Sequence, residues 1–220
     1  MPTLRDTERT RVGRLGERQV FDRDVLDAIL DEALVAHVGY VDDGVPLVLP
    51  FACARDGDHL LLHGSTGAGL LRACSEGHTI SAEVTHLDAL VMARSTFDHS
   101  MNYRSAVVIG VPELVTEEDK AAALDRLVDH LVPGRSAEVR PPLRKELAAT
   151  MIIRLPLDVA SVKVRATGAA TDPDDGEDRT VWAGVLPLRL EAGTPVAEAD
   201  VPTSVPVPPS VLAAGRRLRY

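Results

Sequence analysis

Residues 60–73, with the sequence LLLHGSTGAGLLRA, decide how this chain folds. The leucines predict a buried strand, the small residues from Gly64 to Gly69 predict a turn, and a helix follows. The first amides of a helix have no partner within it, so an oxyanion such as phosphate can bind there. The segment lacks the Gly-Lys-Ser/Thr of a P-loop and the glycine spacing of a dinucleotide-binding fingerprint. A plain strand-to-helix connection would have the same pattern, so both interpretations stay open.

The composition restricts the class of protein. The chain has 220 residues, of which 45% are hydrophobic and only 3% aromatic, so its core must be built from Val, Leu, Ala and Ile. A formal net charge of −9 argues against general binding of nucleic acid or anionic membranes, which needs a basic surface. No apolar run could span a bilayer, and the first residues lack the apolar region of a signal peptide. With two cysteines and no disulfide framework, we expect a cytoplasmic protein.

The order of predicted elements favours a mainly β fold. Helices are expected after Asp22, after Gly69, after Thr116 and after Pro141. Strands are expected at residues 34–41, 45–54, 59–63, 79–85, 89–94, 103–115, 151–155, 161–165 and 182–190. Most neighbouring strands are joined by tight turns and should pair antiparallel, which indicates a closed or half-closed β-barrel decorated by helices. A charged arm over residues 1–20 and a Pro-rich tail over residues 191–220 flank this domain.

Three motifs make the chain resemble a known superfamily. They are the turn His63-Gly64-Ser65, the stretch SMNYRSAVVIG at residues 100–110 and the stretch WAGVLPL at residues 182–188. Their order resembles that of the pyridoxamine 5′-phosphate oxidase-like split β-barrel superfamily, and in particular its flavin-nucleotide-binding branch, which includes nitroimidazole-resistance proteins. The resemblance implies a six- to seven-stranded split β-barrel of the FMN-binding type over residues 21–190.

The resemblance also implies a homodimer with two flavin sites between the subunits, holding FMN or, less often, FAD or a deazaflavin. Backbone groups of Pro50 and Phe51 would meet the edge of the isoalloxazine ring, and the turn from His63 to Gly69 would hold the ribityl phosphate. His63 would lie over the flavin, and Trp182 would close the site from the partner subunit. The expected cofactor-binding residues are Pro50, Phe51, His63, Gly64, Ser65, Thr66, Gly67, Arg72, Asn102, Tyr103, Arg104, Ser105 and Trp182.

The Gly-rich turn departs from the family in its second half. Many relatives have a Lys or Arg there that neutralises the phosphate, whereas this chain has Ala68 and Gly69. The charge would then come from Arg72, Arg94 or Arg104. We favour Arg104, because it interrupts a run that otherwise has the pattern of a core strand and could pair with a buried anion.

These residues also have ordinary structural interpretations. His63 could be a hydrogen-bonded histidine at a strand end, and Arg104 a surface cation. Asn102 and Tyr103 could cap a loop and fill an edge of the core. The cysteines have no basic neighbours and are expected to be core residues.

Two other chemistries find little support. His59 and His63 share one face of a strand, but their Cα atoms would lie about 13 Å apart, so we expect no metal site. The serines lack the context of a nucleophile elbow, which argues against a hydrolase.

We therefore expect a flavin-binding protein, and more specifically an FMN-dependent oxidoreductase in which His63 is the catalytic residue. The flavin would carry the electrons, and the protein would shape access to it. The substrate or electron donor would be a small molecule that the sequence does not identify. The alternative is a non-catalytic carrier or sensor of flavin or haem, because a fold does not determine a function.

Overall fold

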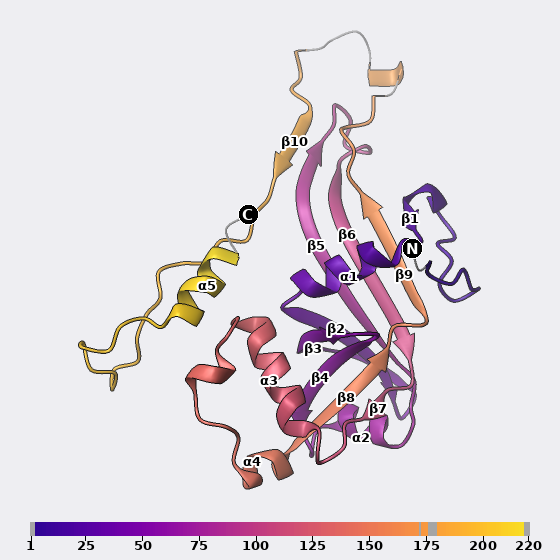
Figure 1. Cartoon of the computed structure of the whole chain (residues 1–220). Coiled ribbons are helices and arrows are strands. Elements are labelled where there is room, and N and C mark those ends of the chain that lie inside the picture. Colours follow the sequence, from indigo (N-terminus) through magenta and orange to yellow (C-terminus); the bar gives the residue numbers. More distant parts are fainter. Residues whose placement is uncertain (1–2, 172, 176–179, 218–220) are drawn as a thin grey trace.

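The computed structural model describes residues 3–171, 173–175 and 180–217, and its main feature is one ten-stranded sheet (Figure 1). The strands are β1 (Gln19–Val20), β2 (Val35–Asp42), β3 (Val45–Asp56), β4 (His59–Ser65), β5 (Ile80–Met92), β6 (Ser100–Gly110), β7 (Glu113–Leu114), β8 (Thr150–Pro156), β9 (Ala160–Arg165) and β10 (Gly184–Pro187). Their order is β1-β9-β6-β5-β2-β3-β4-β8-β7, with β10 paired to β5. All pairings in the described ranges are antiparallel, which confirms the mainly β class.

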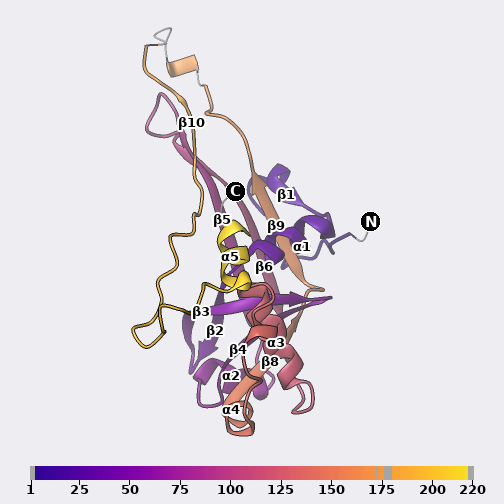
Figure 2. The same cartoon turned by 60° about the vertical axis from the view of Figure 1, so that its left-hand side comes forward.

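The sheet differs from the expected barrel in two ways. It is twisted but not closed, because its end strands β1 and β7 are not paired with one another in the described part of the chain (Figure 2). It also has ten strands in the described ranges instead of six or seven: the short β1 was not expected, and the short β7 and β10 lie within the longer strands expected at residues 103–115 and 182–190. Short edge strands give few hydrogen bonds and little hydrophobic periodicity, so their pattern is hard to detect.

Five α-helices in the described part of the chain flank the sheet. They are α1 (Arg23–Glu32), α2 (Gly69–Ser75), α3 (Lys120–Leu131), α4 (Arg144–Ala149) and α5 (Pro209–Arg217). Asp22 caps α1 as predicted, since its carboxylate accepts a hydrogen bond of 2.9 Å from the amide of Asp24. No helix in the described ranges is long and apolar enough to cross a membrane.

Several expected boundaries are wrong for local reasons. The expected strands at 79–85 and 89–94 are one strand, β5, because Asp88 lies in a bulge of the ladder with β6 rather than in a turn. The helix expected from Thr116 begins only at Lys120, because the carbonyl of Thr116 accepts from the amides of Asp119 and Lys120 and closes a turn. The tail, which has no clear periodicity, ends in α5, whose Ser210 binds the carboxylate of Glu138.

Strand β3 divides the sheet into two parts. Residues 45–52 pair with β2, whereas residues 53–56 pair with β4. The first half therefore has β2 on one edge and, within the described part of the chain, no strand on the other. All side chains from Val45 to Pro50 are exposed, on both faces of the strand.

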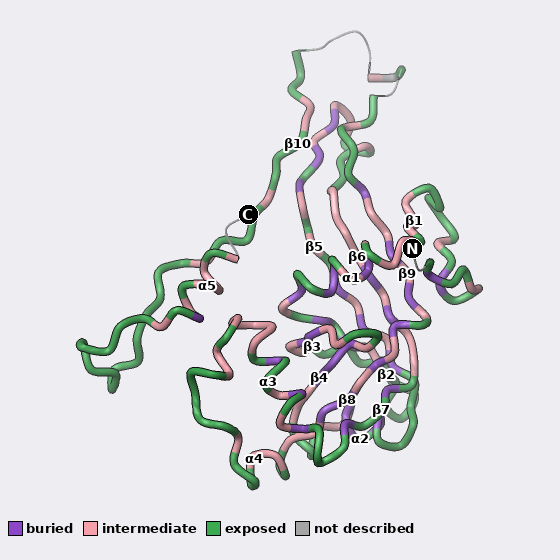
Figure 3. Tube along the Cα trace, viewed as in Figure 1, coloured by how far each residue is buried: buried purple, intermediate pink, exposed green. Residues whose placement is uncertain are grey.

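Hydrophobic residues are buried on both faces of the sheet (Figure 3). On one face, α1 and α2 pack against β2, β5, β6 and β9 through residues such as Leu26, Leu30 and Leu71. On the opposite face, α3 covers Leu61 and Ile152 with Leu127. Both cysteines are buried core residues as predicted, and burial raises the pKa of Cys53 to about 12 and that of Cys74 to about 11.

The attachment of α3 gives a prediction about stability. Leu127→Ala should lower the free energy of unfolding by about 2–5 kcal/mol, because the side chain is fully buried and leaves a cavity. The neighbouring Val128→Ala is the matched control, since Val128 is exposed, and it should cost less than about 0.5 kcal/mol. Urea unfolding followed by circular dichroism measures both. Equal losses for the two variants would show that α3 is not anchored as described.

Candidate functional site

One face of the sheet is left uncovered next to the helix α3. The strand register places three groups of side chains on it, because paired residues in neighbouring strands point to the same side. We call this surface the open face; it consists of Val35, His37 and Gly39 of β2, Val48, Pro50 and Ala52 of β3, and Ser81, Glu83 and Thr85 of β5. Val48 is 65% exposed and Val35 46%, so a surface with considerable apolar character faces outward.

His63 lies at the border of the open face. Leu61 pairs with Ala54, so His63, two residues further along β4, points to the same side as Ala52. Its Nδ1 atom is buried and has no hydrogen-bond partner in the described ranges. Burial lowers the pKa of His63 below its usual value, so the neutral imidazole is favoured. A neutral ring with an unused nitrogen can bind a polar group of a ligand, which agrees with the predicted role of His63 without testing it.

Gly64 is needed for close packing at the end of β4. A Cβ atom at this position would lie 2.9 Å from Cδ1 of Leu71 and 3.6 Å from a ring carbon of Phe51. Glycine therefore allows Phe51 and α2 to pack closely against the end of β4. This contact brings Phe51, Gly64 and the Gly-rich turn together, as the sequence predicted for one site.

The Gly-rich turn has the predicted strand-turn-helix form, but several of its amides are occupied. The amide of Thr66 donates to the carbonyl of Ala149 at 3.1 Å. Those of Gly67 and Ala68 donate to the hydroxyl and the carbonyl of Ser65, at 3.2 and 3.0 Å. These hydrogen bonds reduce the donors that the turn could offer to a phosphate. The side chain of Arg72, on α2, is exposed.

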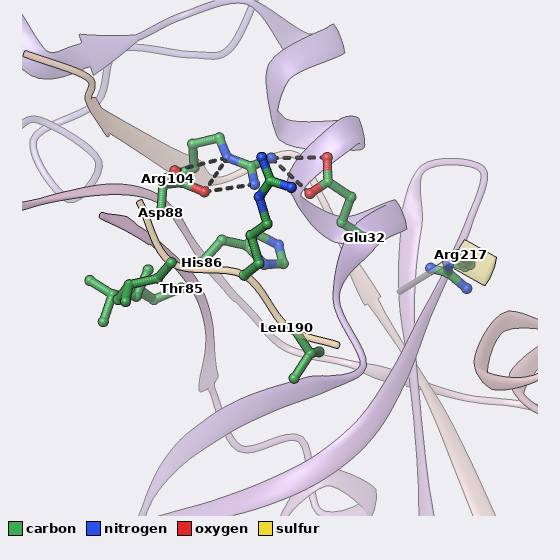
Figure 4. A pocket seen from close by; sticks show the side chains of 10 residues that line it. Glu32, Thr85, His86, Asp88, Arg104, Leu190 and Arg217 are labelled. Carbon is green, nitrogen blue, oxygen red and sulfur yellow. Dashed lines mark hydrogen bonds and ion pairs between the residues drawn. The ribbon is translucent and has the colours of Figure 1, made fainter. Parts of the chain in front are cut away.

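Arg104 is held by acidic residues at a different place (Figure 4). Its guanidinium donates to Asp88 at 3.0 Å and to Glu32 at 2.8 Å, and hydrogen bonding to Asp88 is the largest cause of its raised pKa. The cluster lines a cavity of about 700 Å³ between α1, β5 and the segment after β10. The Gly-rich turn contacts Tyr40 through Gly69. Gly39, next to Tyr40 in β2, is aligned across β5 with Ile109 of β6. Arg104 lies five residues before Ile109 in β6, a distance of about 16 Å along the strand.

The structure therefore does not bring Arg104 to the Gly-rich turn of the same chain. Arg104 was predicted to bind the phosphate because it is a single cation within an apolar run. In the structure its guanidinium is instead paired with Glu32 of α1 and with Asp88 in the bulge of β5. Neither partner could be recognised from sequence spacing, since Glu32 and Asp88 are 72 and 16 residues away.

The neighbours of Arg104 in sequence also have structural partners. Asn102 accepts a hydrogen bond from the buried Arg165, which also donates to the carbonyls of Thr167 and Gly168. The hydroxyl of Ser105 donates to the carbonyl of Lys163 at 3.4 Å. Tyr103 is half-buried in β6 opposite Arg165. These contacts hold β6 and β9 together, and none of them involves the Gly-rich turn.

Trp182 and Arg94 lie near the tip of the β5–β6 hairpin. The indole of Trp182 is 66% exposed and folds over Gly184, where a Cβ atom would lie 2.8 Å from the ring. Nε of Arg94 is buried without a hydrogen-bond partner in the described ranges. Trp182 and Arg94 lie at the Met92 end of β5, whereas His63 lies on β4, which β2 and β3 separate from β5. A site that they share with His63 would therefore need a second subunit.

Sequence reasoning missed a histidine–glutamate pair on the open face. Nδ1 of His37 lies 3.7 Å from the carboxylate of Glu83, directly across the β2–β5 ladder. The carboxylate of Glu83 also accepts a hydrogen bond from the hydroxyl of Thr85. The two strands are about 40 residues apart in sequence, and only their pairing brings these residues together. The only sign of this pair in the sequence was the alternation along each strand, which indicates that His37 and Glu83 lie on exposed faces but not that they are neighbours.

Comparisons with known proteins agree with this fold. The family model for pyridoxamine 5′-phosphate oxidase matches residues 22–164. The structure of the FAD and haem binding protein from Mycobacterium smegmatis is 40% identical, with a TM-score of 0.87, over 90% of this chain and 97% of that one. The flavocytochrome Anf3 from Azotobacter vinelandii is 36% identical, with a TM-score of 0.88, over 94% and 96% of the two chains.

A more distant similarity concerns the fold alone. A putative 5-nitroimidazole antibiotic resistance protein from Bacteroides thetaiotaomicron is 22% identical over 66% of this chain and 86% of that one, with a TM-score of 0.57. A search of curated proteins gives no match.

The buried histidines predict how stability depends on pH. Burial lowers the pKa of both His63 and His130 in the folded chain below the ordinary histidine value of about 6.5. Above that value both rings are neutral whether or not the chain is folded; below it, the unfolded chain binds protons more readily, and stability falls. The free energy of unfolding should thus decrease as the pH is lowered from 7.5 to 5.

The variant His63→Gln should make this pH dependence less steep, and urea unfolding at several pH values measures it. His130→Gln should act in the same direction. A slope that is unchanged in His63→Gln would show that the ring is solvated in the folded chain.

Proposed function

The chain belongs to the pyridoxamine 5′-phosphate oxidase family, and from this we propose that it is a redox protein that binds a flavin, namely FAD, together with haem. The observation that carries the proposal is the similarity to two solved structures at 40% and 36% identity, each over at least 90% of this chain. One is described as an FAD and haem binding protein, the other as a flavocytochrome. Both describe the combination of a flavin with haem.

FAD is the flavin we propose, in place of the FMN expected from the sequence. The relative at 40% identity is named for FAD. The Gly-rich turn also offers a poor anchor for a terminal phosphate, because Ala68 and Gly69 carry no charge and three consecutive amides already have acceptors. A larger dinucleotide could instead spread its contacts over more of the surface.

The chain's own residues fit a flat ring along the first half of β3. Alternate residues of the segment 45–52 have backbone groups on its outer edge that no other described strand uses, and this segment contains Pro50 and Phe51. The small side chains of Gly39, Ala52 and Ser81 leave the adjoining open face flat. Nδ1 of His63, at the border of this face, is a buried polar atom without a hydrogen-bond partner among the described residues. We therefore propose that the flavin ring lies along this edge, with His63 beside it.

We further propose that the protein is a homodimer. The first half of β3 exposes Leu47 and Leu49 on one face and Val48 on the other, with an unpaired edge between them. A strand of this kind is prone to pair with another chain unless it is covered. A second copy would bury these side chains, and two open faces would then enclose the cofactors.

The flavin and the haem would supply the electron transfer, while the protein binds them, excludes water and holds polar groups against them. His63, with its lowered pKa, would offer a neutral ring for a hydrogen bond to the flavin or to a small substrate. A small-molecule electron donor is part of this proposal. Two buried free thiols, Cys53 and Cys74, support a reducing, cytoplasmic location.

The cofactor proposal is tested on the purified chain. We expect both flavin absorption and a Soret band, and we expect chromatography with mass detection to identify FAD after denaturation. FMN as the only released flavin would contradict the choice of FAD. A protein that binds neither flavin nor haem, even when titrated with each at micromolar concentration, would overturn the proposed function. A flavin that no donor reduces would favour the carrier or sensor alternative.

The dimer proposal is tested by a charge on β3. Val48→Glu should convert the protein from about twice the chain mass to the chain mass in light scattering, because a carboxylate would be buried in the apolar contact. It should also weaken flavin binding at least tenfold. Val139→Glu is the matched control, since Val139 is exposed but lies outside the sheet, between α3 and α4, and it should stay dimeric. A monomeric wild-type protein with full flavin affinity would contradict the proposal.

A further inference from the structure

His37 stands out among the histidines of the described chain. Its ring lies on the open face with 57% of the side chain exposed, and its Nδ1 atom faces the carboxylate of Glu83 at 3.7 Å. Nε2 has no hydrogen-bond partner in the described ranges. A carboxylate that holds one ring nitrogen and leaves the other free is the usual arrangement around a histidine that ligates a metal.

The other histidines are less suited to bind iron. Nε2 of His86 and Nε2 of His130 are each held by a backbone carbonyl of the chain. His99 binds the carbonyl of Ser95 at the hairpin tip, and His59 lies at the far end of β4, beyond the residues that α3 covers. His63 has a free ring, but its buried Nδ1 lacks the acceptor that would orient it.

The surroundings of His37 suit a flat, largely apolar ring. Pro50 lies directly across the β2–β3 ladder, Val35 and Gly39 lie two residues away on the same strand, and Val48 lies diagonally opposite. At Gly39 a Cβ atom would lie 3.3 Å from the hydroxyl of Ser81, so a larger residue would disturb this part of the surface. Among the charged side chains of β2, β3 and β5 on this side of the sheet, Glu83 pairs directly with His37, and Asp56 lies further along β3, where it pairs with Arg126 of α3.

We propose that His37 is an axial ligand of the haem iron through Nε2, and that Glu83 is the positioning residue that holds its ring. This inference rests on the proposed function, because it needs a chain that binds haem. Thr85 extends the arrangement, since its hydroxyl donates to the carboxylate of Glu83 and fixes it from the other side. The open face would thus hold haem at β2 and the flavin at the border near His63.

The carboxylate should also affect the iron. The negative charge of the Glu83 carboxylate, 3.7 Å from Nδ1, favours electron donation from the imidazole through its other nitrogen. A stronger donor stabilises ferric over ferrous iron, so the reduction potential should depend on Glu83. This readout separates a positioning role from a merely structural one.

The first experiment compares His37→Ala with the wild-type protein loaded with haem. The variant should bind haem at least tenfold more weakly, and its Soret maximum should shift because the iron loses a nitrogen ligand. Millimolar imidazole should restore the wild-type spectrum. His78→Ala is the matched control, because His78 is similarly exposed and lies 3.9 Å from Glu76 but precedes β5 and is not part of the open face. It should leave the spectrum and the affinity unchanged.

The second experiment tests Glu83→Gln, which keeps the size of the side chain and removes its charge. The variant should retain haem, and its haem reduction potential should rise in spectroelectrochemical titration. An unchanged potential would overturn the role of Glu83.

The outcomes distinguish this inference from the proposed function. A wild-type protein without a Soret band would overturn haem binding itself. A normal wild-type Soret band that persists unchanged in His37→Ala would overturn only the assignment of His37, and its loss in His63→Ala would assign the iron to His63. Circular dichroism of each variant identifies any loss of fold, and His37→Gln repeats the test with a polar side chain of similar size.

Discussion

The structure depends on the divided hydrogen bonding of β3. One continuous strand pairs with β2 along its first half and with β4 along its second, so the sheet separates at Ala52 and Cys53. The second half is buried beneath α3 on one face and packed against the larger core on the other. From Val45 to Pro50 the strand has neither cover, and only Phe51 in the first half packs against the core. This division creates the unpaired edge, the exposed valines and leucines and the flat surface beside them.

The division also determines where polar chemistry is possible. His63 lies where β3 and β4 separate, so its ring is half-buried and one nitrogen has no acceptor. On the neighbouring strands, His37 and Glu83 face each other across the ladder on the same side of the sheet. A cofactor placed along β3 would therefore meet both histidines. By contrast, the cluster of Arg104, Asp88 and Glu32 is already neutralised within the chain and lies on the α1 side of the sheet.

Much of the fold could be predicted because it follows from local patterns. The hairpin turn at Asp43-Gly44, where both residues have positive φ, and the N-cap at Asp22 depend only on nearby residues. The strand-turn-helix at residues 59–75 is likewise where the leucines and glycines indicate. The bulge at Asp88 was predicted as a turn, because a polar residue between two apolar runs has the same pattern in both cases. The helix α5 was missed because its apolar residues are few and follow a Pro-rich segment.

The sequence by itself determined the mainly β class, the antiparallel hairpins, the core positions and the membership of a family recognised by short motifs. These depend on hydrophobic periodicity and turn chemistry, which act between residues close in the chain. Only the tertiary structure decided which side chains share a face. It separated Arg104 from the Gly-rich turn and joined it to Glu32, and it placed His37 opposite Glu83. Such pairs arise from strand register between segments dozens of residues apart, and a shift of one residue would turn every side chain to the other face.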